Sequence, residues 1–186
     1  NMKTPTPTII AFLCFTLTAM TQTQYYIDKD KTTLQWEGYY QFYFGGHEGT
    51  VDFTEGFISM LNDDIVGGYF TVDMTTLVNT DGGYNEGLTN HLKDPDFFHV
   101  SKYPEASLNI TEVIYHTRQK INVRADLTIK GITNAVNFNA DIDYDKKSLS
   151  TQFKVDRTLW GITYGSKLKD NALSDAIGFI VNLVFE

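Results

Sequence analysis

The stretch Asn90–Pro104, NHLKDPDFFHVSKYP, followed by Leu127–Val136, LTIKGITNAV, is the most informative part of this chain. The first stretch places the aromatic pair Phe97-Phe98 after a polar run and closes on Pro104. Because proline fixes φ and disfavours the helical region for the residue before it, Pro104 returns the chain to extended geometry. We therefore predict a short helical segment around residues 85–99, with the aromatic pair packed beneath another element.

Outward from these stretches, the hydrophobic residues repeat with a period of two, which is typical of strands with one buried face. The clearest row is Ile121, Val123, Ala125, Leu127 and Ile129, and further rows begin at Leu34, Val51, Val66, Ala106, Val136, Phe153 and Ile177. Turn residues separate the rows at Asn62-Asp63-Asp64, Asp81-Gly82-Gly83, Gly131–Asn134 and Asp145-Lys146-Lys147. With Phe57–Leu61 counted as its own strand, the pattern predicts eight or nine strands.

Short antiparallel strands with one apolar face must close either as a sandwich or as a barrel, and the pattern alone does not decide between them. An up-and-down order joined by short turns favours a barrel, because closure removes unpaired edges. We therefore predict an all-β protein, an antiparallel barrel of eight strands or nearly so. The helical segment is expected to cover one opening, with one ring of Phe97-Phe98 inserted and the other packed on the outer wall.

The front of the chain has the features of a secretory signal peptide. Lys3 supplies a positive start, Ile9–Leu17 an apolar run too short to span a bilayer, and Thr18–Thr21 small residues near a cleavage site. An uncleaved anchor and a buried strand are the alternatives. We predict a cleaved signal peptide at residues 1–21, one domain at residues 22–186, and a periplasmic location, with secretion as a further option.

Composition argues against several classes of function. Cys14, the single cysteine, lies in the apolar run, so the chain after cleavage has no disulfide, thiol nucleophile or cysteine metal site. Removal of Lys3 leaves 14 basic against 23 acidic residues, a net charge of −9, without any basic run. Nucleic acid and anionic membrane surfaces are poor partners for such a chain, and no integral membrane span is expected after cleavage.

Several short motifs, taken in their order and spacing, resemble the YceI-like family of polyisoprenoid-binding proteins with a lipocalin-like barrel. They are Gly45–Thr50, Gly67–Phe70 with Asp73-Met74, His91–Lys93 with Asp96–Phe98, Lys102–Pro104, Leu127–Thr133 and Val155–Gly161. The resemblance covers about residues 26–186 and implies a tunnel that holds a polyprenyl chain, usually behind a signal peptide and in the periplasm. The chain departs from the family pattern at Leu88–Asn90, where many members have Arg-Asp, and at His47, which many members flank with serine.

The large inward-facing residues are the candidates for a tunnel lining. They are Trp36, Phe53, Phe70, Val72, Phe97, Phe98, Leu108, Leu127, Phe138, Phe153, Trp160 and Phe179. The pattern alone favours side chains that simply fill a core, since any sheet requires apolar alternation. The resemblance instead favours a tunnel, with a polyisoprenoid or an isoprenoid quinone as the partner.

Arg157 continues the row of Phe153, so alternation places it inside the barrel near the end of a strand. An interior arginine requires a partner. Its guanidinium could clamp a phosphate or quinone oxygen at the mouth, or it could form a structural ion pair with Asp73, Asp94 or Asp96. We favour the ion pair, with a head group contacting backbone or tyrosine groups at the mouth.

No sequence motif points to catalysis or to a metal. His47-Glu48, His91 and His99 lack metal-ligand spacing, and His91 is expected to anchor the helical turn by hydrogen bonds. GxSxG, P-loop and GxGxxG patterns are absent, and a carboxylate pair such as Glu48 and Asp96 has no distinguishing spacing. We therefore expect no enzyme activity, no cofactor and no metal, and we leave a homodimer open.

The sequence thus predicts an exported, soluble lipid-binding protein that holds a long apolar ligand for transport, storage or protection. The first alternative is a barrel enzyme or stress-response protein that handles a small polar substrate. The second is a structural domain with a filled core.

Overall fold

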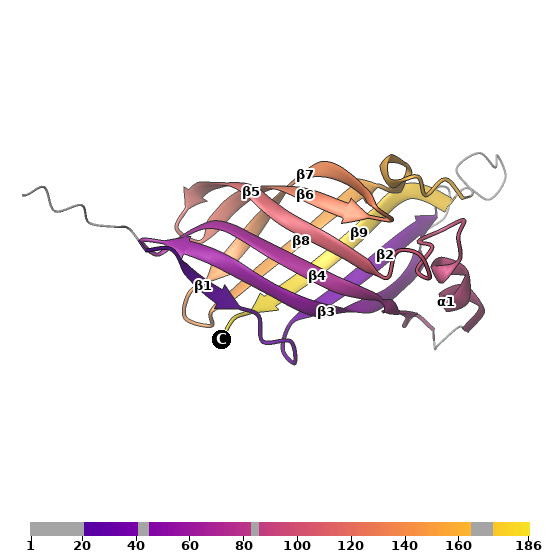
Figure 1. Ribbon diagram of the computed structural model, residues 1–186, viewed down its shortest axis with the longest axis horizontal. Coiled ribbons are helices and arrows are strands. Elements are labelled where there is room, and N and C mark those ends of the chain that lie inside the picture. The colour runs from indigo at the N-terminus through magenta and orange to yellow at the C-terminus, as the bar shows by residue number, and fades with distance from the viewer. Residues whose placement is uncertain (1–20, 41–44, 83–85, 165–172) are drawn as a thin grey trace, which may run out of the picture.

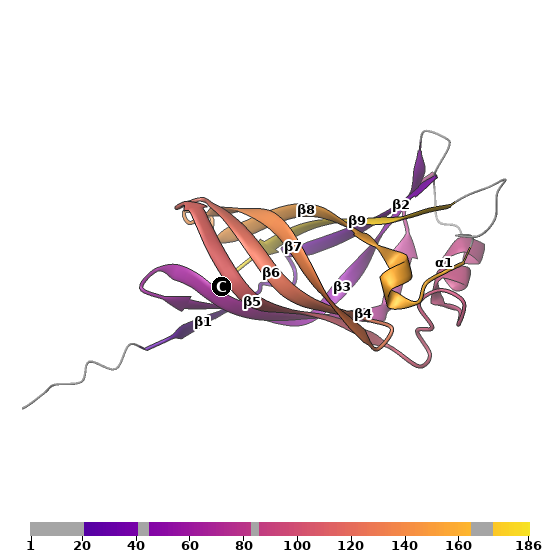
Figure 2. The same ribbon diagram turned by 90° about the horizontal axis from the view of Figure 1, so that it is seen from above.

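A closed antiparallel sheet dominates the computed structural model, which describes residues 21–40, 45–82, 86–164 and 173–186. The strands are β1 (Thr23–Tyr26), β2 (Thr33–Tyr40), β3 (Gly46–Leu61), β4 (Asp64–Asn79), β5 (Glu105–Thr117), β6 (Lys120–Ile129), β7 (Ile132–Asp143), β8 (Ser148–Asp156) and β9 (Leu173–Val184). The helix α1 (Glu86–Lys93) and the 3-10 helix η1 (Arg157–Trp160) lie at one end of the barrel, and β1 lies at the other (Figures 1 and 2). The signal peptide predicted at residues 1–21 falls, apart from Thr21, outside the described residues.

The strand order is that of an up-and-down barrel. From β2 to β9 each strand pairs with its neighbours in sequence, and the pairing of β2 with β9 closes the ring. The short strand β1 pairs with the far end of β3, and Ile27 bridges to Phe185, so β1 serves as a detached beginning of β2. The predicted eight-stranded antiparallel barrel is therefore confirmed. No helix among the described residues is long and apolar enough to cross a membrane.

Alternation predicts the inward face well wherever a strand is regular. All five residues of the clearest row, Ile121 to Ile129 on β6, are buried. The separate strand expected at Phe57–Leu61 is wrong, because these residues continue β3, which is bent by three register shifts against β4. At one of these shifts Val66 is an extra residue, so it is 41% exposed while Ile65 is 2% exposed and faces inward. The bulge reverses the alternation at this point and overturns the inward position expected for Val66.

Three hairpins use loops of two residues, and in two of them both loop residues have positive φ, which matches the favoured twist of such a hairpin. Asn62 and Asp63 form one loop, with φ of 52° and 67°, and Lys130 and Gly131 form the other, with φ of 53° and 72°. The second loop is thus shorter than the turn expected at Gly131–Asn134. The turn expected at Asp81-Gly82-Gly83, of which Gly83 lies outside the described residues, follows β4, and the next element is α1 and not a strand.

The segment after α1 forms a cap over one end of the barrel, as predicted, although only Glu86–Lys93 are helical. Hydrogen bonds from the Phe98 amide to the Leu92 carbonyl (3.1 Å) and from the Val100 amide to the Lys93 carbonyl (3.0 Å) hold the following turns against the helix. Leu92, Phe97 and Val100 then join a buried cluster with side chains of the barrel wall. We refer to residues 86–103 below as the cap.

The stretches Asn90–Pro104 and Leu127–Val136 contact each other in the fold. The Tyr103 ring lies over Gly131 so closely that a Cβ atom there would be 2.7 Å from the ring. The Lys130 ammonium donates a hydrogen bond to the Pro95 carbonyl at 2.9 Å. These contacts fasten the cap to the β6–β7 hairpin.

Substitution of Gly131 by alanine tests this attachment. Gly131→Ala and Gly82→Ala both place a Cβ atom on a residue with positive φ, which costs about 1–2 kcal/mol at each site. Only Gly131 faces a ring, whereas nothing lies within 4 Å of the Cβ position at Gly82. Overpacking should therefore destabilise Gly131→Ala by about 1–3 kcal/mol more than Gly82→Ala in urea unfolding. Equal losses of stability in the two variants would show that the Tyr103 contact does not hold the cap.

Candidate functional site

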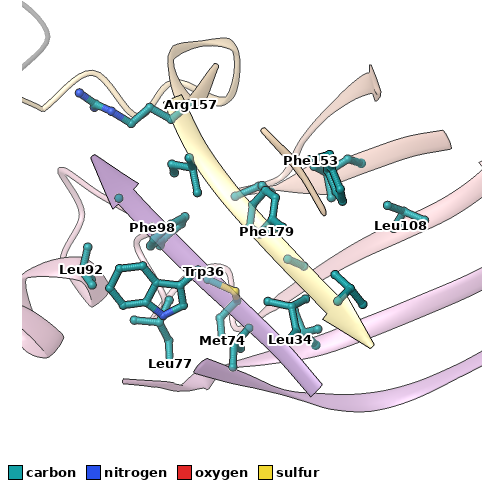
Figure 3. A pocket seen from close by; sticks show the side chains of 18 of the residues that line it. Leu34, Trp36, Met74, Leu77, Leu92, Phe98, Leu108, Phe153, Arg157 and Phe179 are labelled. Atoms are coloured by element: carbon teal, nitrogen blue, oxygen red, sulfur yellow. The ribbon is translucent and has the colours of Figure 1, made fainter. Parts of the chain in front are cut away.

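The barrel encloses a cavity of about 350 Å³, lined by side chains from strands β2 to β9 and from the cap (Figure 3). This volume lies at the lower end of the range of about 300–1,000 Å³ that is typical of small-molecule sites. Most of the lining side chains, and nearly all of the lining surface, are apolar. The cavity contradicts the alternative of a completely filled core.

The sequence-predicted tunnel residues mostly reach this cavity. Those that line it are Trp36, Phe53, Phe70, Val72, Phe97, Phe98, Leu108, Leu127, Phe138, Phe153 and Phe179. Trp160 does not, because η1 ends the alternation of β8 and turns this ring into the packed core. There it is 1% exposed and donates a hydrogen bond from Nε1 to the Leu127 carbonyl at 3.0 Å. Direct contact of the other side chains with a ligand stays a prediction.

Aromatic rings form a firm wall on one side of the cavity. Phe138 and Phe153 stack with their centroids 4.4 Å apart, and Phe179 continues the row 5.3 Å from Phe153. In the cap, both Phe97 and Phe98 line the cavity, with their centroids 5.4 Å apart. The expected placement of one of these two rings on the outer wall is therefore wrong.

Arg157 borders the cavity at its cap end and is 1% exposed. Its guanidinium donates hydrogen bonds to the Ile162 carbonyl (2.7 Å), the Ser174 carbonyl (3.1 Å) and the Asp175 carboxylate (3.1 Å). Burial lowers the pKa of Arg157, and the charge of Asp175 opposes that shift.

The predicted ion pair of Arg157 is therefore present, but with a different partner. Asp175 takes the place of Asp73, Asp94 and Asp96, which had been the expected candidates. The reason lies in β9, whose register against β2 shifts between Leu173 and Ile177 and brings the Ser174 carbonyl and Asp175 to the guanidinium.

A chain of polar groups lies at the cap end of the cavity, and sequence reasoning missed it. His47 Nδ1 lies 2.7 Å from Asp81 Oδ2, and the Tyr40 hydroxyl lies 2.8 Å from His47 Nε2. Asn79 donates to the other oxygen of Asp81 at 2.7 Å, and this bond does most to lower the pKa of that carboxyl, with His47 adding to the effect and burial opposing it. Tyr40 and His47 both line the cavity. Tyr40 continues the inward row of the sequence that begins at Leu34, which was the available signal.

A second imidazole borders the same end. His91 Nε2 lies 3.2 Å from Asp96 Oδ2, which confirms the expected role of His91 in holding the turn after α1. Its ring also meets the edge of Tyr164, with centroids 4.5 Å apart. Since Tyr40 and Tyr164 line the cavity and are both exposed, this end is the mouth. Among the residues that the structure describes, no group of three or more His, Cys, Asp or Glu side chains could hold a metal ion.

Solved structures share this fold at low sequence identity. BcnA of Burkholderia cenocepacia superposes with a TM-score of 0.72 at 16% identity, over 85% of this chain and 98% of that one. A polyisoprenoid binding domain from Saccharophagus degradans, implicated in plant cell wall breakdown, gives a TM-score of 0.62 at 13% identity, over 87% and 97%. The YceI protein of Campylobacter jejuni gives 0.51 at 16% identity, over 97% and 93%. At these identities the likeness establishes the fold alone.

Curated relatives match shorter segments. A UPF0312 protein of Photorhabdus laumondii is 42% identical over 52 residues, which is 28% of this chain and 27% of the relative. A UPF0312 protein of Vibrio campbellii is 34% identical over 70 residues, which is 38% and 35%. The matches thus span about a quarter to a third of the relatives' own lengths. The model of the YceI-like domain matches residues 25–185, and the chain therefore belongs to the YceI-like family.

Proposed function

We propose that this protein binds a polyisoprenoid, either a polyprenyl lipid or an isoprenoid quinone, with the apolar chain inside the barrel. The observation that carries the proposal is the apolar cavity, whose wall offers few polar partners to a small polar substrate. The structural similarity to the polyisoprenoid binding domain from Saccharophagus degradans supports the same ligand class. The wall also favours a binding protein over the alternative of a barrel enzyme.

The energetics of such binding rest on desolvation. Each methylene group removed from water contributes about 0.8 kcal/mol, without any need for directional contacts. The rings of Phe138, Phe153 and Phe179 are already packed against one another, so few side chains need to be ordered when the ligand enters.

The protein is further proposed to work in the periplasm, after loss of residues 1–21, in the transport, storage or protection of its ligand. Lys3 and the apolar run Ile9–Leu17 support export. Because a prenyl chain is nearly insoluble in water, a barrel that shields it from solvent would allow the lipid to cross an aqueous compartment.

The most direct test of occupancy is organic extraction of protein purified from its native host, followed by mass spectrometry. Prenyl lipid should be recovered with the unmodified protein. Leu108→Trp places a large ring in the cavity, whereas Asn109→Trp adds the same ring to the exposed face of the same strand. Lipid per protein should fall several-fold in Leu108→Trp and stay unchanged in Asn109→Trp. An extract of the unmodified protein without prenyl lipid would contradict the proposal.

Affinity should also depend on chain length. With geraniol, farnesol and geranylgeraniol, each added isoprene unit should tighten binding by about tenfold or more, because further methylene-sized groups leave water. The gain should stop once the chain exceeds the cavity. Fluorescence of Trp36, which lines the cavity, reports the titration. Equal affinity for all three alcohols would place binding outside the barrel.

Arg157→Met separates architecture from ligand recognition. The change leaves the Ser174 and Ile162 carbonyls without their donor, so the ligand-free protein should lose about 2–4 kcal/mol of stability in chemical unfolding. Lys154→Met removes an exposed cation from the preceding strand and should cost less than about 1 kcal/mol. Unchanged stability of ligand-free Arg157→Met, combined with lost ligand stabilisation, would instead assign Arg157 to the head group.

A further inference from the structure

The charges at the mouth of the cavity restrict the head group that can sit there. Arg157 is the one lysine or arginine among the described residues that line the cavity, and its charge is balanced by Asp175. The two imidazoles at the mouth, His47 and His91, each face a carboxylate. A phosphate or diphosphate would therefore meet carboxylates without an unpaired cation from this lining, and transfer of its charge from water would be costly.

In the chain of polar groups Asp81–His47–Tyr40, each hydrogen bond has a defined donor and acceptor. The Asp81 carboxylate can only accept, so His47 donates through Nδ1, and in the neutral ring this leaves Nε2 as an acceptor. The Tyr40 hydroxyl, 2.8 Å away, then donates its proton to Nε2. With its proton committed, the Tyr40 oxygen has lone pairs left to accept a hydrogen bond. Tyr40 is 40% exposed and lines the cavity, so its side chain lies at the mouth.

We infer that the mouth recognises a neutral head group bearing a hydroxyl, an alcohol or a phenol, which donates its hydrogen bond to the Tyr40 oxygen. The inference rests on the proposed function, because the apolar chain of the same ligand occupies the barrel. His47 and Asp81 are positioning residues, which hold the Tyr40 hydroxyl in the orientation that accepts. A ligand whose oxygen carries no hydrogen gains nothing from this arrangement.

Three probes that share one prenyl chain separate the contribution of the hydroxyl hydrogen from those of the oxygen and of a negative charge. Geranylgeraniol carries the hydroxyl, its methyl ether keeps the oxygen but loses the donor, and geranylgeranyl diphosphate carries the charge. A neutral hydrogen bond corresponds to about a three- to tenfold change in affinity. The alcohol should therefore bind about three- to tenfold more tightly than the ether in Trp36 fluorescence titrations, and the diphosphate should bind more weakly than either.

Tyr40→Phe should abolish the preference for the alcohol while leaving the affinity for the methyl ether unchanged. Tyr39→Phe is the matched control, since the neighbouring Tyr39 points away from the cavity and donates to Glu37, and it should keep the full preference. His47→Leu should lower the preference in the unmodified background and have no further effect on it in Tyr40→Phe. Such coupling in a double-mutant cycle is not expected of a residue that only supports the fold.

Three outcomes overturn this inference. One is tighter binding of the diphosphate than of the alcohol. Another is a preference for the alcohol that survives in Tyr40→Phe, and the third is an equal loss of alcohol and ether affinity in that variant, which would mean that Tyr40 only packs. Failure of the proposed function has a different signature, because then the methyl ether itself would not bind.

Discussion

The pairing of β2 with β9 is the constraint on which the rest of this structure depends. It joins the first long strand of the barrel to the last, from Thr33 with Asn182 to Tyr40 with Leu173, and so removes the edges that an open sheet would expose. Closure also converts the apolar face of every strand into one shared interior. Trp36 and Phe179 are paired across this seam, and both line the cavity.

A closed barrel of this size can be filled by its own side chains or left hollow, and the two ends of this one differ. At the β1 end a buried cluster that includes Ile27, Ile142 and Phe185 packs inside the barrel. At the other end the cap and η1 lie beside the mouth, and buried polar groups such as Arg157 are satisfied by carbonyls and by Asp175. Because the protein satisfies these groups itself, the interior can remain apolar and the polar atoms can be confined to the mouth.

Sequence patterns predicted the barrel and most of its inner face, since the row on β6 and the aromatic rows on β7 to β9 have the period of a regular strand. The predictions failed where a bulge or a helical turn interrupts the alternation of inward and outward residues. A bulge exposes Val66, and η1 moves Trp160 from the cavity to the core. The partner of Arg157 depended on a register shift in β9 that no local pattern encodes.

The polar chain at the mouth was equally beyond local patterns. Its members come from β2, β3 and the turn after β4, and only the register of these strands brings them together. Family resemblance did not supply it either, because His47 stands at a position where the chain departs from the family pattern. Such a site becomes visible only with distances between side chains.

Photo-crosslinking tests the central claim most directly, namely that the interior of the barrel holds the prenyl chain. A prenyl alcohol with a photoreactive diazirine near its tail would be bound, irradiated and located by peptide mass spectrometry. The account predicts labels on inward-facing residues of β7 to β9, such as Phe138, Phe153 and Phe179. Labels confined to outward-facing neighbours, such as Asn139 and Lys154, would contradict it.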